Sequence, residues 1–183
     1  MISNVITRRD FSLRIATLLT GLGIAKTGVA STDETRLEVA NGNEEISHAA
    51  ESIHQEIVLK ASRKRVYAAL TEAEQFTKVM RLSKFPDGPA AAISREAGGS
   101  FSLFGDRIVG RHIELVPNER LVQAWRAGHW ETGMYSIARF ELKEQAEQTR
   151  IVFDHTGFPN GQAEHLLEGW NSNYWEPLRK YLA

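Results

Sequence analysis

The sequence of 183 residues contains no cysteine. Without thiols it can form neither a disulfide, nor a cysteine nucleophile, nor a thiolate metal site. It also lacks an apolar run of the roughly 18 to 20 residues that a membrane-spanning helix needs. Positive charge is not in excess, because 22 Lys and Arg face 23 Asp and Glu, for a net charge of −1. We therefore expect no nucleic-acid partner and no stable membrane span.

The residues that are present have the composition of a folded domain. Hydrophobic residues make up 42 % of the chain and charged residues 25 %, which is typical of globular proteins. The length suits one domain with a short additional segment.

The additional segment is the N-terminus, which has the pattern of a twin-arginine signal. The motif TRRDF at residues 7–11 precedes an apolar run, Ile15–Ala25, that is too short to span a bilayer. Gly28 and Ala30 then suit cleavage after Ala30. This order of charged, apolar and small residues predicts that residues 1–30 are a secretory signal peptide of the bacterial twin-arginine type.

The alternative for this segment is a helix that packs on the domain. Its three glycines disfavour that alternative, since each helical Gly costs up to ~1 kcal/mol relative to Ala. Residues 31–52 are polar and acidic without periodicity, and we interpret them as a linker. The sequence thus predicts an exported, periplasmic protein whose folded domain spans residues 53–183.

The domain begins with a strand and two short helices. Residues 53–59 alternate as a strand in which Val58 faces away from the core. Ser62 is expected to cap a first helix. Thr71 and Glu74 have the spacing of a capping box, which would open a second helix.

Six strand-like runs follow, separated by short turns rich in Gly, Pro, Asn and Asp. Short connections favour antiparallel pairing of successive strands. The runs cover residues 90–96, 100–104, 107–116, 120–126, 134–142 and 149–155.

The last segment has the apolar spacing of one long helix. Pro177 lies inside it and should bend its final turns. A long apolar helix needs a surface to cover, and the sheet is the one available. We therefore predict an α+β fold: a curved antiparallel sheet of six or seven strands with the long C-terminal helix across it. The apolar positions are 163, 166, 167, 170, 174, 178 and 181.

This order of elements resembles the helix-grip superfamily, also called START-like or SRPBCC. The motifs ASRKRVYAALTEAEQF, AGGSFSLFGDRIVGRHIELVPNERLVQAWR and DHTGFPNGQAEHLLEGW resemble the branch named for the activator of the heat-shock chaperone ATPase, C-terminal domain. The resemblance covers roughly residues 53–182. Ser62, Tyr67 and Val79 depart from the residues usual in that branch, so ligand choice does not transfer.

The resemblance implies a cavity between the sheet and the last helix, lined by aromatic residues. We predict no catalytic residue, no cofactor and no metal site. His165 and Glu168 have an i,i+3 spacing that could supply two metal ligands, but no second His accompanies them. The candidate ligand-binding residues are Tyr67, Phe101, His112, Trp125, Trp130, Phe140, Trp170 and Tyr174.

Several polar residues lie on the predicted strands and could face the cavity. They are His112, Arg126, Arg139 and Asp154. Asp154 and His155 are adjacent on one strand and therefore point to opposite faces, which excludes a local dyad.

Three functions fit this sequence. The first is non-enzymatic binding of a small hydrophobic molecule, which we favour. The second is the chaperone-activator role that the resemblance implies, through protein–protein contact. The third is a polyketide cyclase or dehydratase type of enzyme, which needs an acid–base pair at the cavity. Because the chaperone is cytosolic, the predicted export leaves the second role open only if the protein is not exported.

Overall fold

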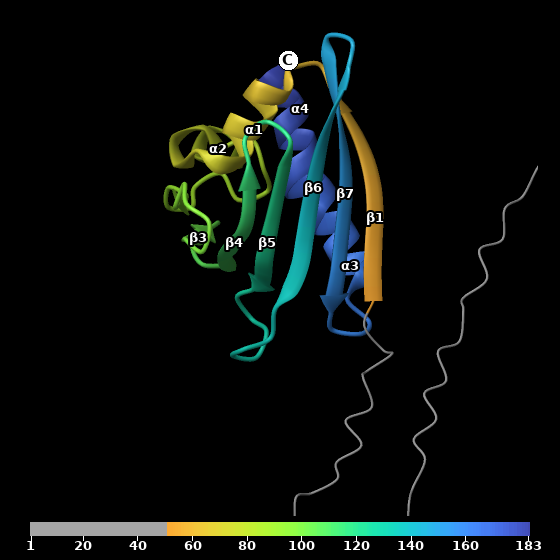
Figure 1. The fold of residues 1–183 in the computed structure, drawn as a ribbon. Coiled ribbons are helices and arrows are strands. Elements are labelled where there is room, and N and C mark those ends of the chain that lie inside the picture. Colours follow the sequence, from red (N-terminus) through yellow and green to blue (C-terminus); the bar gives the residue numbers. More distant parts are fainter. Residues whose placement is uncertain (1–50) are drawn as a thin grey trace, which may run out of the picture. The chain divides into compact units, whose positions relative to one another are not determined.

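The structure, a computed structural model, describes residues 51–183. In this part of the chain, seven strands form one antiparallel sheet in the order β1-β7-β6-β5-β4-β3-β2, and the C-terminal helices cross one of its faces (Figure 1). The predicted helix-grip fold class is confirmed. The strands are β1 (Glu51–Leu59), β2 (Ala92–Ile93), β3 (Ser100–Leu103), β4 (Ile108–Val116), β5 (Arg120–Ala127), β6 (Ser136–Gln145) and β7 (Gln148–Phe158). The predicted signal peptide and residues 31–50 of the linker lie outside the described residues.

The chain crosses from one edge of the sheet to the other through two short helices, α1 (Arg63–Thr71) and α2 (Ala73–Met80). Ser62 caps α1 as predicted, because its side chain accepts a hydrogen bond from the Arg65 N–H at 3.4 Å. The predicted capping box at Thr71 and Glu74 is wrong. Thr71 is the buried last residue of α1, and its hydroxyl donates to the Tyr67 carbonyl at 2.8 Å.

From β2 onward the strands form a meander that ends with β7 paired to β1. The strand predicted over residues 90–96 shrinks to β2, Ala92–Ile93, since only these two residues pair with β3 at the sheet edge. In β4, Gly110 permits a close approach of two strands. A Cβ there would lie 2.1 Å from the Ala124 carbonyl oxygen, closer than any side chain tolerates.

The C-terminal helical segment consists of α3 (Ala163–Trp170), a π-helical turn η1 (Asn171–Trp175) and α4 (Glu176–Leu182). The π turn is closed by the Glu176 N–H, which donates to the Asn171 carbonyl five residues earlier. It ends at Trp175, two residues before Pro177, which has no N–H of its own to donate. The irregularity expected at the proline is therefore a π turn on its N-terminal side.

The extra residue in the π turn shifts the buried stripe of the segment. Trp175 and Leu182 are buried, whereas Tyr181 is only half-buried. The regular spacing in the sequence placed position 181 on the stripe and left position 175 out of it. A π turn holds one residue more than an α-helical turn, which rotates all that follows by about one position.

The inner face of the sheet and the helical segment enclose one core. Buried and exposed side chains alternate along β6, with Ala138 and Phe140 buried and Ile137 and Arg139 exposed. No helix within residues 51–183 is both long and apolar enough to cross a membrane.

Candidate functional site

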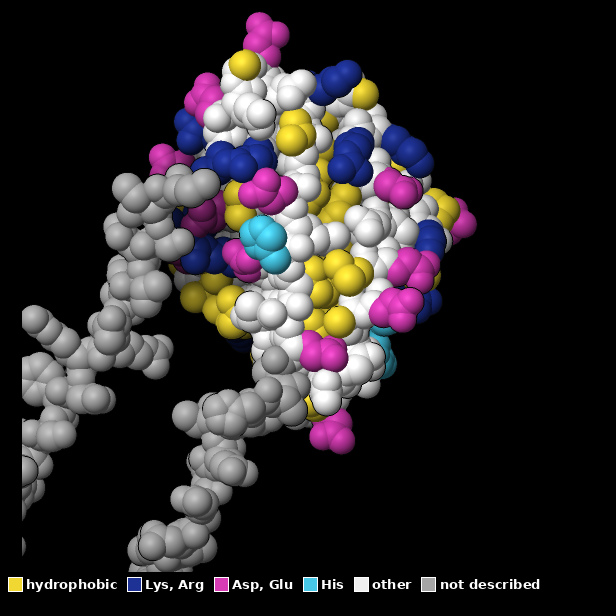
Figure 2. Space-filling model, turned by 90° about the vertical axis from the view of Figure 1, so that its right-hand side faces the viewer, with side chains coloured by type: hydrophobic (Ala, Val, Ile, Leu, Met, Phe, Trp, Pro, Cys, Tyr) yellow, Lys and Arg dark blue, Asp and Glu magenta, His cyan; other side chains and the backbone are white. Residues whose placement is uncertain are grey.

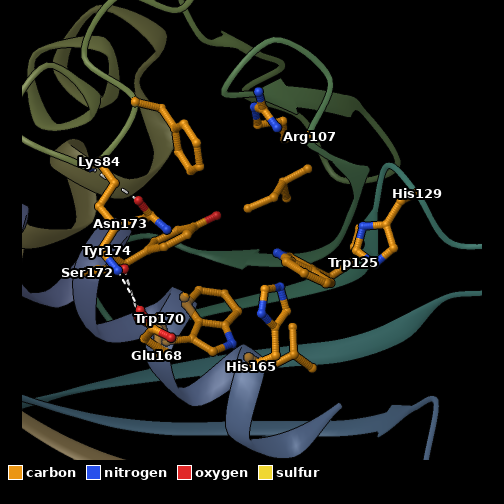
Figure 3. A pocket seen from close by; sticks show the side chains of 15 residues that line it. Lys84, Arg107, Trp125, His129, His165, Glu168, Trp170, Ser172, Asn173 and Tyr174 are labelled. Carbon is orange, nitrogen blue, oxygen red and sulfur yellow. Dashed lines mark hydrogen bonds and ion pairs between the residues drawn. The ribbon is translucent and has the colours of Figure 1, made fainter. Parts of the chain in front are cut away.

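A cavity of about 330 Å³ lies beneath α3 and η1. Three structural units form it (Figure 3): the ends of β4 and β5, the loop that follows α2, and the helical segment. The lining residues are Lys84, Phe85, Arg107, Ile108, Trp125, Ala127, His129, His165, Leu166, Glu168, Gly169, Trp170, Ser172, Asn173 and Tyr174.

The inner walls of the cavity are aromatic. Trp170 contacts Tyr174 with ring centroids 4.3 Å apart, and Trp125 contacts Trp170 at 5.7 Å. All three side chains are at most 4 % exposed. Such walls favour an apolar molecule over water.

The rim of the cavity is charged. Lys84 in the loop forms an ion pair with Glu168 of α3 at 2.5 Å, and this pair lowers the pKa of the Glu168 carboxyl. The Lys84 backbone N–H also donates to the Asn173 side chain at 3.4 Å. Arg107 stands over the ring of Phe85, 4.7 Å from its centroid. The loop is thus tied to the helical segment by contacts at solvent-exposed positions.

Next to the cavity, the buried His155 lies at the centre of a linear hydrogen-bond chain. We call this chain closed because every polar side-chain atom in it has a partner. The Trp170 indole N–H donates to His155 Nδ1 at 3.0 Å. Nδ1 is therefore the acceptor nitrogen, so the proton of the neutral ring lies on Nε2, 2.7 Å from the Ser136 hydroxyl. That hydroxyl donates to the Trp125 carbonyl at 3.0 Å. Burial lowers the pKa of His155 to about 3, so the ring stays neutral at physiological pH.

Two polar atoms at the cavity stand apart from this chain. The Trp125 indole N–H and the Tyr174 hydroxyl are buried, and neither has a hydrogen-bond partner among residues 51–183. Burial raises the pKa of Tyr174, and hydrogen bonding from the Trp125 side chain partly offsets the rise, so the two groups lie close to each other although neither makes a hydrogen bond of ordinary geometry. Both residues therefore bring unused hydrogen-bonding groups to an otherwise apolar wall.

The structure brings three of the eight predicted ligand-binding residues to the cavity: Trp125, Trp170 and Tyr174. The other five do not line it. Trp130 packs behind Trp125, Phe140 lies against Phe153 in the core, Phe101 contacts His112, and Tyr67 is a half-buried residue of α1.

The helical and strand patterns missed most of the rim, since the loop around Lys84 and Phe85 has no periodicity to read. A Cβ at Gly169 would meet no atom within 4 Å, and the residue lines the cavity. A glycine next to an aromatic in a helix is the signal that could have found it.

None of the polar strand residues that the enzyme hypothesis needs lines the cavity. Arg126 donates to the backbone carbonyls of Trp130 and Glu131. Asp154 accepts from His54 on the outer face at 2.7 Å, and Arg139 pairs with Glu141 there. His112 is buried away from the cavity, without a partner for either ring nitrogen within residues 51–183.

The rim also contains His129, His165 and Glu168. Within the described part of the chain, no three His, Cys, Asp or Glu side chains are placed together to hold a metal ion. Glu168 is instead engaged by Lys84.

Comparison with known proteins places the fold in a family. Residues 60–183 match the family model described as "Activator of Hsp90 ATPase homolog 1-like protein", which is more than half of the chain. The chain belongs to this family. That assignment agrees with the resemblance seen in the sequence motifs.

The curated relatives are longer proteins. The chain is 28 % identical over 107 residues to "Activator of 90 kDa heat shock protein ATPase homolog 2" of Mus musculus, covering 58 % of this chain and 32 % of that protein. A Dictyostelium discoideum homologue is 29 % identical over 105 residues, which cover 57 % of this chain and 27 % of that protein. The chain thus spans about a third or less of the relatives' length.

Solved structures share the fold. An HSP90 activator from Plasmodium falciparum superposes with a TM-score of 0.65 at 23 % identity, covering 72 % of this chain and 95 % of that chain. The Aha1 dimer from Colwellia psychrerythraea gives a TM-score of 0.58 at 20 % identity, covering 72 % and 96 %. At these identities the likeness concerns the fold alone.

Proposed function

We propose that this domain binds a small hydrophobic molecule in the cavity between the sheet and the C-terminal helical segment, without catalysing a reaction. The observation that carries this proposal is the aromatic-walled cavity of about 330 Å³ under α3 and η1. Its volume lies in the range of small-molecule sites. The polar strand residues on which the enzyme hypothesis depends, His112, Arg126 and Asp154, do not line the cavity.

Gly169 offers a direct test, because a side chain there enters open space at the cavity. Replacing a helical Gly also favours the helix by up to ~1 kcal/mol. Gly169→Leu should therefore fill part of the cavity without unfolding the domain. Gly169→Ala is the matched control, since it makes the same helix-favouring change but adds only a methyl group.

Binding can be followed with N-phenyl-1-naphthylamine, a neutral dye that fluoresces in apolar sites. We expect one dye molecule per wild-type protein, similar affinity for Gly169→Ala, and affinity at least about tenfold weaker for Gly169→Leu. Thermal unfolding should show both variants folded. Equal affinity in all three proteins, or no dye binding by the wild type, would overturn the proposal.

A second measurement searches for the natural ligand. Native mass spectrometry of the protein purified from its own compartment should show a mass increment for a bound small molecule. The increment should be missing from Gly169→Leu. A wild-type protein recovered without any bound molecule, together with no dye binding, would contradict the ligand-binding function.

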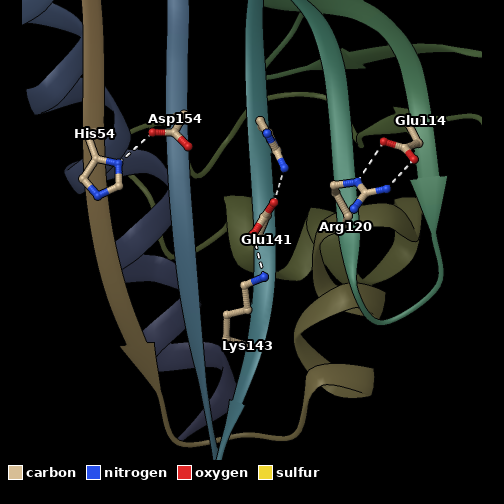
Figure 4. Close-up of polar contacts among 7 residues, drawn as sticks. His54, Glu114, Arg120, Glu141, Lys143 and Asp154 are labelled. Atoms are coloured by element: carbon tan, nitrogen blue, oxygen red, sulfur yellow. Dashed lines mark hydrogen bonds and ion pairs between the residues drawn. The ribbon is translucent and has the colours of Figure 1, made fainter. Parts of the chain in front are cut away.

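The family assignment favours a second candidate, a chaperone-activator-like role. It would use a surface instead of a cavity. On the outer face of the sheet, charged side chains pair with one another (Figure 4): Arg120 with Glu114 at 2.6 and 2.8 Å, and Lys143 with Glu141 at 2.6 Å. Figure 2 shows charges of both signs with hydrophobic groups between them on the side that carries β1.

The ATPase rate of a purified Hsp90-type chaperone distinguishes the two roles. Under the ligand-binding proposal, a several-fold molar excess of this protein leaves that rate unchanged. Under the activator role the rate rises, and the charge reversal Arg120→Glu reduces the rise while Gly169→Leu does not.

We also propose that residues 1–30 direct export through the twin-arginine pathway. A reporter fused to residues 1–35 should reach the periplasm, and changing Arg8 and Arg9 to Lys should keep it in the cytoplasm. A reporter that stays in the cytoplasm with both arginines intact would remove the objection to the activator role.

A further inference from the structure

The two unpartnered polar atoms of the cavity restrict the chemistry of its ligand, provided that the proposed ligand-binding function holds. Buried polar groups are hydrogen-bonded in the great majority of cases, and an exception calls for an explanation. Here the Trp125 indole N–H and the Tyr174 hydroxyl are both without a partner among residues 51–183. Both residues line the same cavity.

The two atoms converge from opposite walls. Trp125 comes from β5 and Tyr174 from the π turn η1. In Figure 3 the indole nitrogen and the phenol oxygen are directed toward each other, and the Trp125 side chain is close enough to influence the Tyr174 hydroxyl. Their rings form the wall itself, so an atom placed between them would be surrounded by apolar surface on its other sides.

The other unpartnered buried atoms do not share this setting. Trp130 Nε1 and the two ring nitrogens of His112 also have no partner within the described residues, but neither residue lines the cavity. The unpartnered polar groups at the cavity are therefore the Trp125 indole N–H and the Tyr174 hydroxyl. The indole can only donate a hydrogen bond, whereas the hydroxyl can donate or accept one.

The charges of the cavity lie at its rim. Lys84 is paired with Glu168, and Arg107 is an exposed residue over the ring of Phe85. The charged side chains that line the cavity, Lys84, Arg107 and Glu168, are exposed, whereas Trp125 and Tyr174 are buried. A carboxylate or ammonium group placed between these two residues would be desolvated without a counter-ion, which is costly.

We propose that the ligand is an apolar ring compound with one neutral oxygen, a hydroxyl or a carbonyl, held between the Trp125 N–H and the Tyr174 O–H. The oxygen accepts from the indole and exchanges a second hydrogen bond with the phenol. Its apolar body packs against Trp170 and extends toward the rim. Phenols, alcohols and ketones of ring compounds belong to this class, whereas hydrocarbons and deeply placed carboxylates do not.

The test compares two probes of nearly equal size, 2-naphthol and 2-methylnaphthalene, by displacement of N-phenyl-1-naphthylamine. Replacing the hydroxyl by a methyl group removes the oxygen and keeps the shape. The protein variants are Tyr174→Phe, which deletes one oxygen atom, and Trp125→Phe, which deletes the indole N–H. Tyr181→Phe is the matched control, because Tyr181 lies on the same helical segment and does not line the cavity.

In the wild type and in Tyr181→Phe, 2-naphthol should bind about tenfold more tightly than 2-methylnaphthalene, as two hydrogen bonds in a dry site allow. Tyr174→Phe and Trp125→Phe should each lose most of that preference while still binding 2-methylnaphthalene. A preference that is missing in the wild type, or unchanged in both variants, would overturn this inference and leave ligand binding intact. Failure of both probes and of the dye to bind the wild type would instead overturn the proposed function.

Discussion

Two polar regions lie side by side beneath the helical segment, and they differ in how completely their hydrogen bonds are made. Around His155, Trp170, Ser136 and the Trp125 carbonyl form a closed chain. In the adjoining second region, the Trp125 indole N–H and the Tyr174 hydroxyl have no hydrogen-bond partner in residues 51–183. Trp125 and Trp170 belong to both regions, since the Trp125 carbonyl and the Trp170 N–H enter the closed chain and both rings line the cavity.

The two regions have different roles, because satisfied and unsatisfied polar groups affect a folded domain differently. A buried polar network with all bonds made fixes the positions of its members. Buried polar atoms without partners destabilise the empty domain, because each forgoes the hydrogen bonds it makes with water in the unfolded chain. The first region thus sets the cavity floor, and the second is where a ligand has hydrogen bonds to gain.

The largest expected effect comes from acid, which breaks the closed chain. The pKa of His155 is about 3 in the folded protein and about 6.5 in an unfolded chain. The unfolded state therefore binds the additional proton between these values, and stability present above pH 6.5 is lost as the pH falls toward 3. The loss attributable to His155 is at most roughly 5 kcal/mol.

Urea unfolding from pH 8 to pH 4 measures this effect. His155→Gln is the control, because an amide can both donate and accept but does not titrate in this range. As the pH falls, the free energy of unfolding should decrease more steeply in the wild type than in the variant. The difference in slope corresponds to at most one additional proton bound by the unfolded state. Parallel curves for the two proteins would show that His155 accepts its proton without cost.

Trp170→Phe should break the same chain from its donor end. The variant keeps an aromatic wall but leaves His155 Nδ1 buried without a donor. We expect a loss of about 2–3 kcal/mol in the free energy of unfolding, from the orphaned nitrogen and the smaller ring. Trp175→Phe offers a contrast, since the Trp175 indole donates to Gln55, a half-buried side chain, at 2.9 Å. A larger loss there than at Trp170 would contradict the special role of the closed chain.

Tyr174→Phe should have a smaller effect of the opposite sign on the empty domain. The change deletes an oxygen that has no partner, so the folded state gains up to about 1 kcal/mol. Urea unfolding without added ligand measures it. Marked destabilisation would mean that the hydroxyl is already satisfied, and the contrast between the two regions would disappear.

The smallest effect is expected on the outer face of the sheet. Asp154→Asn replaces the carboxylate that accepts a hydrogen bond from His54. The Asp154 and His54 side chains are 42 % and 60 % exposed, respectively. Exposed pairs contribute up to about 1 kcal/mol and are screened by salt. Urea unfolding at low and high salt should show a change within that limit. A larger change would reveal a role for this face in the stability of the fold.

Much of this comparison could not be read from the sequence, although the fold could. The spacing of apolar residues predicted the sheet and the C-terminal helices, because burial on one face imposes a period. Trp125, Trp170 and Tyr174 were predicted at the cavity since large aromatics on those elements must face the interior. The sequence does not show which of them is satisfied, because hydrogen bonds depend on distances between strands and helices far apart in the chain.

The same limit explains the individual errors. His155 was recognised as pointing away from Asp154, but nothing in DHTGF reveals its partners Ser136 and Trp170. His112, Phe101 and Phe140 had the residue type of a cavity wall but lie elsewhere in the core. The rim at Lys84 and Arg107 is made by loops, for which side-chain periodicity gives no direction.

The π turn at Asn171–Trp175 has a consequence for how this domain can vary. It separates α3, which provides much of the cavity wall, from α4, which packs against β1 and the short helices, and it sets their buried stripes out of phase. If the turn became a regular α-helix with every residue kept, Leu178 and Leu182 would rotate about a quarter-turn off the core, whereas deletion of one residue within the turn would leave both facing it. Substitutions in α3, in contrast, leave the anchoring of α4 untouched. The turn thus makes the helical segment modular: one half can diversify to suit different molecules while the other keeps the fold.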